Sequence, residues 1–193
     1  NPVKKVSDFI GFVNAVIFSP NDMNLFSAQP KVRRKFMDIE LSKCSKTYMF
    51  TLNEYYRVLK QRNAYLKNEN INRDYLYVLD EKCAELQSII IHQRYKFLQD
   101  LMNISLPFYE QLSLDHTKMS LVYKTFVNIN DQTKMKEDIL KGFEDNFDRD
   151  IYLKTTEKGI HKDDFKIMIN EKEAEEFASQ GQKRTILLAL KVG

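Results

Sequence analysis

Hydrophobic residues recur at helical spacing through the middle of the chain and predict two long amphipathic helices. Between residues 42 and 67 they are separated by three, four or seven positions, as in one stripe of an α-helix. A second stripe, which runs towards Pro107, repeats every seven positions. The two sets are Tyr48, Leu52, Tyr55, Leu59 and Leu66, then Leu76, Cys83, Ile90, Phe97 and Ile104. A short polar segment, residues 68–74, separates them, so we expect an antiparallel helical hairpin.

The flanking segments mix strands with shorter helices. Apolar residues 13–18, followed by a turn at 19–22, predict a buried strand, and residues 31–41 after Pro30 predict a helix. Alternating patterns predict further strands at 119–127 and 164–170, the latter forming a hairpin through residues 171–172. Further helices are expected at 135–147 and after Ser179. The fold class expected is α/β, or α+β when this part of the chain is taken by itself.

Composition narrows the class of protein. The chain is 43% hydrophobic and 30% charged, with five glycines and four prolines, which is typical of a folded, helix-rich protein with a sizeable core. A net charge of +3 is too small to require a polyanionic partner. Cys44 and Cys83 are far apart, without metal-ligand spacing, and no apolar run reaches membrane-spanning length. Residues 1–5 are not a signal peptide, so we expect a cytoplasmic protein without a membrane or a metal site.

No segment of the chain carries a nucleotide-binding loop. A phosphate-binding loop needs glycines five residues apart before Lys-Ser/Thr, and no pair of glycines has that spacing. Residues 76–81, LYVLDE, imitate a Walker B strand, but they lie in phase with the second helical stripe. We therefore expect a helix here, with Asp80 and Glu81 as solvent-facing acids of its first turn.

The distinctive polar cluster lies near the end of the printed sequence. Ser179 precedes an apolar helix and is suited to cap it, while Gly181 permits close backbone approach. The free N–H groups of a helix N-terminus bind anions, and Lys183 and Arg184 add positive charge. The alternative interpretation is a simple capped helix whose apolar residues 186–190 dock on a core.

Five segments of the sequence together resemble one protein family. Residues 177–185, FASQGQKRT, resemble the signature motif of ABC-type ATPases in the form found in the RecF family. Residues 18–23, FSPNDM, resemble its FSPEDL turn, and residues 30–38, PKVRRKFMD, its P-x-x-R-R-x-F-L-D helix. Residues 59–63 match its L-K-Q-R-N run, and residues 159–164, GIHKDD, resemble its G-P-H-R-D-D segment. The departures, Asn21, Ile160 and Lys162, affect details of two turns.

The resemblance implies part of an ABC-type ATPase head, similar to that of SMC proteins, with an inserted antiparallel helical arm. The implied divisions are a head strand and turn at 1–30, the arm at 31–112, a return to the head at 113–155 and the signature segment at 156–193. Walker A would precede Asn1 and Walker B would follow Gly193. ATP, with Mg²⁺, would lie between two heads. This chain alone would therefore bind no nucleotide tightly, would contain no catalytic residue and would be inactive. The full-length dimer would be a weak ATPase.

The resemblance also implies residues and partners. The residues that would contact ATP on the opposite subunit are Ser179, Gln180, Gly181, Gln182 and Lys183. His161, Lys162 and Asp163 would form a polar turn near the nucleotide interface, or else a loop that merely caps the following strand. Basic residues offered for DNA phosphates, or else forming only a solvated helix face, are Arg33, Arg34, Lys35, Lys60 and Arg62. The partners implied are double-stranded DNA and junctions of single- and double-stranded DNA, a second copy of the protein, and RecR and RecO, with which it would load RecA at single-strand gaps.

Two other functions are compatible with the residues. One is a helical protein-interaction module in which the Ser179 cluster is only a cap. The other is a different SMC-like ATPase with a short arm, which the blocks at 30–38 and 59–63 disfavour. The first predicts no response to ATP in a longer protein.

Overall fold

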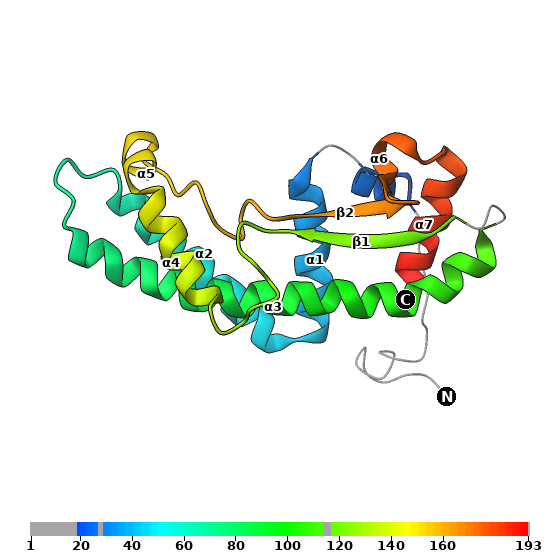
Figure 1. The fold of residues 1–193 in the computed structure, drawn as a ribbon, viewed down its shortest axis with the longest axis horizontal. Helices are drawn as coiled ribbons and strands as arrows, with labels where there is room; N and C mark the ends of the chain where they lie inside the picture. Colours follow the sequence, from blue (N-terminus) through cyan, green and yellow to red (C-terminus); the bar gives the residue numbers. More distant parts are fainter. Residues whose placement is uncertain (1–18, 27–28, 114–116, 193) are drawn as a thin grey trace, which may run out of the picture.

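A computed structural model describes residues 19–26, 29–113 and 117–192 of the chain. The molecule is elongated, with the long helix α3 running along most of it (Figure 1). The strand predicted for residues 13–18 lies outside the described residues. None of the helices described is both long and apolar enough to cross a membrane.

The predicted helical hairpin is confirmed. Helix α2, Lys46–Tyr65, and helix α3, Arg73–Leu112, pack side by side and are joined by residues 66–72. Both begin at side-chain caps, because Ser45 accepts a hydrogen bond from the backbone of Tyr48 and Asn72 from that of Tyr75. The hairpin is therefore specified by its polar ends as well as by its apolar stripes.

Helix α3 departs from the prediction at its C-terminal end. It continues through Pro107 to Leu112, and Ile104, the last member of the predicted stripe, is 51% exposed. A seven-residue repeat drifts around a straight α-helix of 3.6 residues per turn, so its last member leaves the buried face. The segment 76–81 is helical, as expected.

Two further helices cover the arm. Helix α4, Met135–Asp145, packs against α3 through buried Ile139 and Phe143. The single helix predicted for 135–147 ends at Asp145, and a short helix α5, Phe147–Leu153, follows directly. From here on, the arm means α2, the first half of α3, α4 and α5, a different set from the residues 31–112 that the resemblance implies, because α4 packs on α3 and α1 packs on β2.

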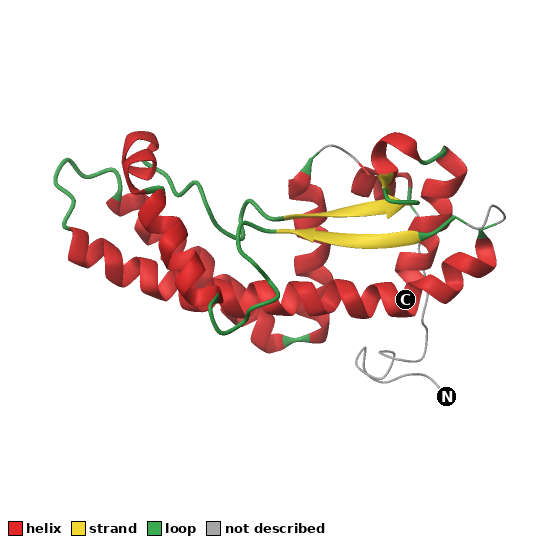
Figure 2. Cartoon of the chain, in the orientation of Figure 1, coloured by secondary structure: helices red, strands yellow, loops and turns green. Residues whose placement is uncertain are grey.

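The remaining elements surround a small sheet (Figure 2). We call the sheet and these surrounding elements the head. Strands β1, Met119–Lys124, β2, Asp164–Ile169, and β3, Lys172–Glu173, are antiparallel in the order β1-β2-β3. The predicted hairpin is confirmed: Asn170 and Glu171 both have positive φ, as a two-residue turn of type I′ requires. Strand β1 ends at Lys124, three residues before the predicted end.

Helices α1, Pro30–Cys44, α6, Ala174–Phe177, and α7, Gln180–Val192, and the short 3₁₀ helix η2, Pro20–Phe26, complete the head. Buried residues form one core in the head and another in the arm. Helix α3 serves both, with Ile90 in the arm core and Leu98 and Leu101 in the head core. The structure is thus a mixed, helix-rich fold with a small antiparallel sheet, in which one continuous helix joins the two cores.

Candidate functional site

Ser179 is exposed and directly precedes α7, in the short link between α6 and α7. Figure 1 shows these two helices beside the sheet. The Ser179 hydroxyl accepts a hydrogen bond from the backbone N–H of Gln182 at 3.2 Å, and the Gln182 side-chain oxygen accepts one from the backbone N–H of Ser179 at 2.8 Å. This reciprocal arrangement is a capping box. It holds the serine and the first turn of the helix in one orientation.

The first turn of α7 has the properties of an anion site. The backbone N–H groups of Gln180 and Gly181 have no acceptor within the helix, and the helix dipole favours negative charge there. A side chain added at Gly181 would meet only the Ser179 hydroxyl, at 3.8 Å, so the space in front of this backbone is open. Lys183 is turned back instead: its ammonium donates to the carbonyl of Glu175 at 2.7 Å.

The turn at 161–163 lies at the other end of β2, next to the arm. Among the described residues, no hydrogen bond or ion pair joins this turn to Ser179, Gly181 or Lys183. Within one chain the structure therefore does not bring His161, Lys162 and Asp163 together with the Ser179 cluster. That these three residues lie near a nucleotide at the interface between two copies of the protein stays a prediction.

Two members of that turn, Asp163 and His161, are anchored by hydrogen bonds to neighbouring segments. The Asp163 carboxylate is 1% exposed, accepts a hydrogen bond from Tyr123 and lies 3.3 Å from the Arg94 guanidinium. Burial raises the pKa of Asp163, although Arg94 acts in the opposite direction. His161 is hydrogen-bonded to the Tyr55 hydroxyl at 2.8 Å and to the carbonyl of Thr156 at 2.9 Å, and burial lowers its pKa. His161 is therefore a neutral, anchored side chain rather than a cation.

The prediction of DNA binding is wrong for two of the basic residues, Arg33 and Arg62. Arg33 is 2% exposed and makes a bidentate pair with Asp164, at 2.7 and 2.8 Å. Arg62 is fully buried and pairs with Asp80 at 2.5 Å and with Asp150 at 2.7 Å. Because these guanidinium groups are enclosed and paired, neither presents a charged surface to a phosphate.

The same contacts correct the expectation for Asp80. It is not a solvent-facing acid of a first turn, because α3 begins at Arg73 and the Asp80 side chain is 13% exposed. Burial raises its pKa, and Arg62 opposes that shift. Asp80 is thus the structural counter-ion of Arg62.

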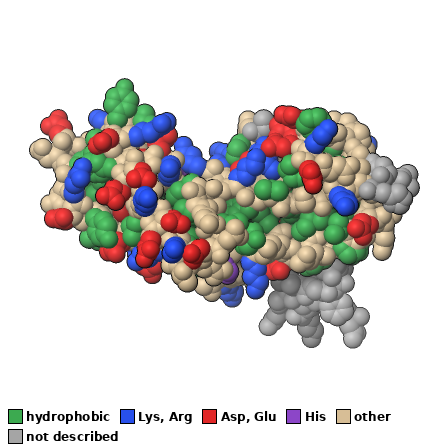
Figure 3. Space-filling view, in the orientation of Figure 1, with side chains coloured by type: hydrophobic (Ala, Val, Ile, Leu, Met, Phe, Trp, Pro, Cys, Tyr) green, Lys and Arg blue, Asp and Glu red, His purple; other side chains and the backbone are tan. Residues whose placement is uncertain are grey.

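Arg34, Lys35 and Lys60 remain at the surface. Helical spacing explains the division in α1, where Arg33, Met37 and Leu41 form the buried face. A helical wheel of α1 would have placed Arg33 on the buried face, apart from Arg34 and Lys35. It would also have placed Lys31 among the exposed basic residues, although the motif match did not include it. On the face shown in Figure 3, basic side chains gather around the junction of arm and head.

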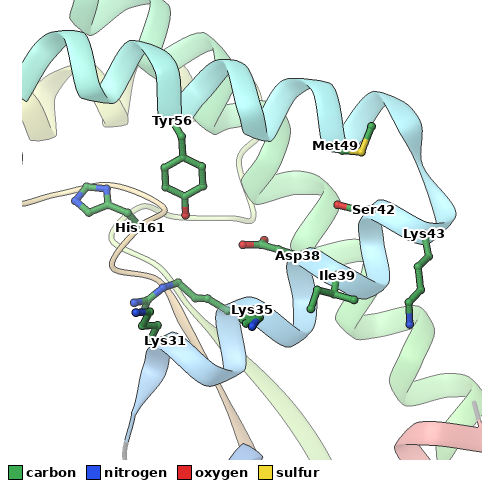
Figure 4. A pocket seen from close by; sticks show the side chains of 10 residues that line it. Lys31, Lys35, Asp38, Ile39, Ser42, Lys43, Met49, Tyr56 and His161 are labelled. Carbon is green, nitrogen blue, oxygen red and sulfur yellow. The ribbon is translucent and has the colours of Figure 1, made fainter.

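A groove beside α1 contains several of these residues (Figure 4). It has a volume of about 680 Å³ and lies between α1, the first half of α2 and the turn at His161. We call it the α1–α2 groove. Its lining residues are Lys31, Arg34, Lys35, Asp38, Ile39, Ser42, Lys43, Met49, Tyr56 and His161.

Comparison with known proteins gives a consistent answer. Over 97% of its length, the chain is 38% identical to a DNA replication and repair protein RecF from Streptococcus agalactiae and 40% identical to one from Oenococcus oeni. By sequence, the chain corresponds to half of a RecF protein. It spans 51% and 53% of those two relatives. The resemblance drawn from the five segments is confirmed.

Solved RecF structures agree with the sequence comparison. Two structures of the recombination mediator protein RecF in the RecFOR pathway, described as RecF-ATPrS and RecF-ATP, match with TM-scores of 0.85 and 0.86. Each is 32% identical to the chain, and the match covers 98% of the chain and 52% of the solved one. No family model matches. The fold described above is therefore that of about half of RecF.

Proposed function

We propose that the full-length protein containing this chain binds ATP between two copies, each offering its Ser179 cluster to the nucleotide held by the other. The observation that supports this most directly is the N-terminus of α7, where an exposed, fixed serine hydroxyl and the open backbone at Gly181 lie together. A hydroxyl donor and helix N–H groups suit the γ-phosphate of a nucleotide. Hydrolysis would remove the group that both copies share and open the dimer.

The relatives' names support a role in DNA replication and repair, and the RecF structures described with nucleotides support ATP binding. On this proposal the protein acts in the cytoplasm as a weak, Mg²⁺-dependent ATPase whose ATP-bound dimer holds duplex DNA. It works with RecR and RecO to load RecA at single-strand gaps. The phosphate contacts come from Lys31, Arg34, Lys35 and Lys60, since these cations are not enclosed in the interior. Such contacts are independent of sequence and weaken with salt.

Substitution at Ser179 tests the proposal. In the full-length protein, Ser179→Arg places a bulky cation where the γ-phosphate would lie, so we expect loss of ATP-dependent dimerisation and of ATP-dependent duplex binding. Binding of ATP to the monomer should be unchanged, because on this proposal each copy holds its own nucleotide and Ser179 contacts only the nucleotide of the other copy. Dimerisation is measured by light scattering and ATP affinity by a fluorescent nucleotide.

Two control variants complete the design. Ser120→Arg, at another exposed serine, should dimerise as the wild type does. Ser179→Ala removes the cap without adding bulk and should weaken α7 by about 1 kcal/mol while retaining partial dimerisation. If Ser179→Arg dimerises normally with ATP, the cluster is only a helix cap, and the interaction-module function becomes the better explanation.

A further inference from the structure

The α1–α2 groove has a positively charged rim. Lys31 and Lys35 are exposed and form no ion pair with any residue in the described part of the chain. Arg34 adds a half-buried guanidinium, which is held by a 2.6 Å hydrogen bond to the carbonyl of Asp163. Lys43, at the far end, is neutralised by Glu40 at 2.8 Å. The rim therefore carries uncompensated positive charge at the end formed by the start of α1 (Figure 4).

The one carboxylate in the groove does not cancel this charge. Asp38 lies 2.8 Å from Arg94 and accepts a hydrogen bond from Tyr48 at 2.5 Å, so its charge is matched from the interior. His161 is neutral, because burial lowers its pKa. An incoming ligand would thus meet lysine and arginine without a competing free acid.

The rest of the groove is apolar, and duplex DNA does not explain that. Ile39 and Tyr56 are 43% and 40% exposed, and Met49 is 36% exposed, on two helices that face each other across the hollow. Phosphates need cations and hydrogen-bond donors, whereas exposed aliphatic and thioether side chains around a hollow are typical of a surface that receives an apolar side chain. We call Ile39, Met49 and Tyr56 the floor of the groove. The apolar floor and the positively charged rim together match a ligand that is both acidic and apolar.

We propose that the α1–α2 groove binds an acidic segment of a partner protein, with an aliphatic or aromatic side chain seated among Ile39, Met49 and Tyr56 and its carboxylates on Lys31, Arg34 and Lys35. An apolar anchor in a pocket, surrounded by charge contacts, is the usual anatomy of such an interface. This inference rests on the proposed function in one respect, since the same three cations are assigned there to DNA phosphates. The acidic segment and duplex DNA then exclude each other, and partner binding releases this part of the protein from DNA.

The test uses the full-length protein and a fluorescein-labelled octapeptide with blocked ends, in which Leu-Phe is flanked on each side by three acidic residues. Fluorescence anisotropy measures its affinity at fixed salt. A second peptide with Ser-Ser in place of Leu-Phe has the same charge. We expect the second peptide to bind at least about tenfold more weakly, because it lacks the apolar anchor. The same assay with a labelled 20-base-pair duplex measures DNA affinity, and unlabelled peptide should displace that duplex.

Three variants separate the contributions. Ile39→Ser/Met49→Ser should weaken the Leu-Phe peptide about tenfold or more and leave duplex binding unchanged, because it alters the floor and not the rim. Val78→Ser, at a 60% exposed apolar residue on the arm, is the matched control and should change neither. Lys31→Gln/Lys35→Gln should weaken both ligands.

Each contrary result has a distinct meaning. Equal affinity for the two peptides, or a normal affinity of Ile39→Ser/Met49→Ser for the Leu-Phe peptide, would show that only charge attracts the peptide and would overturn the proposal. A single-stranded oligonucleotide whose binding depends on Ile39 and Met49, with no such dependence for the peptide, would overturn it in favour of a nucleic-acid pocket. If Lys31→Gln/Lys35→Gln weakens the peptide but not the duplex, the peptide site stands and the DNA contacts proposed for α1 fail.

Discussion

Arg94 ties the arm to the head, and its removal should loosen that junction in a measurable way. It lies in the middle of α3 with its side chain fully buried. Its guanidinium donates to the Asp38 carboxylate (2.8 Å), the Ile160 carbonyl (2.9 Å), the Tyr48 hydroxyl (3.1 Å) and the Asp163 carboxylate (3.3 Å). These partners come from α1, from α2 and from the turn before β2. One side chain therefore connects α3 with the consecutive helices α1 and α2, which precede it, and with a turn 66 positions after it.

The substitution Arg94→Met keeps the apolar stem of the side chain and removes the charge. Two carboxylates then lose their cation: Asp163, which is 1% exposed, and Asp38, which is 19% exposed. Removing one partner of a buried pair costs about 3–5 kcal/mol. Burial already raises the pKa of Asp163, so protonation would relieve part of the penalty, and we expect a loss near the lower limit, about 3 kcal/mol.

Hydrogen exchange of the full-length protein measures this loss where it occurs. Amides of β2 and of residues 156–163 should lose protection by about a hundredfold, since each factor of ten corresponds to about 1.4 kcal/mol. The control is Arg57→Met, whose partner Glu54 lies on the same helix surface and whose side chain is 58% exposed; protection should not change. A loss of less than about threefold for Arg94→Met would refute the view that this ion pair holds the junction.

Two further predictions concern the turn at 159–161. Gly159→Ala should destabilise the protein by more than about 1 kcal/mol, because φ is +153° and the new Cβ would lie 2.7 Å from the Tyr55 hydroxyl and 2.8 Å from His161 Nδ1. Gly181→Ala is the control and should not destabilise the protein, because the space around Gly181 is open. Equal melting temperatures of the two variants would contradict this prediction. Burial lowers the pKa of His161, so the unfolded chain binds a proton that the folded chain does not; the stability contributed by neutral His161 is complete above its ordinary pKa of 6.5 and is lost as pH falls below it. Between pH 7.5 and 5.5 the melting temperature of the wild type should fall more than that of His161→Gln, and parallel curves would exclude this role.

Local rules account for the parts of the fold that the sequence predicts well. The helical hairpin follows from apolar spacing over residues 42–107, and its starts follow from Ser45 and Asn72 as caps. The turn between β2 and β3 and the capping box of Ser179 with Gln182 also depend on neighbours within a few residues. Each of these features is decided by contacts between residues that the chain itself keeps close.

Local rules do not predict which arginines are buried. In sequence, Arg33 and Arg34 are adjacent and chemically identical, but one is sealed in the head and the other lies at the edge of a groove. The difference depends on Asp164, 131 positions away from Arg33, because a buried guanidinium is tolerated only where a carboxylate meets it. Likewise, Asp150 meets Arg62 from 88 positions away.

Local sequence patterns were sufficient to predict the helical hairpin, the hairpin of the sheet, the helix that begins after Ser179 and, through five ordered motifs, the resemblance to RecF. Which cations are buried in ion pairs, which remain exposed, and the presence of an apolar hollow beside the exposed ones became evident from the packed fold. Burial and charge pairing are set by segments that folding brings together from distant parts of the chain. Helical spacing and capping, in contrast, act within a few residues.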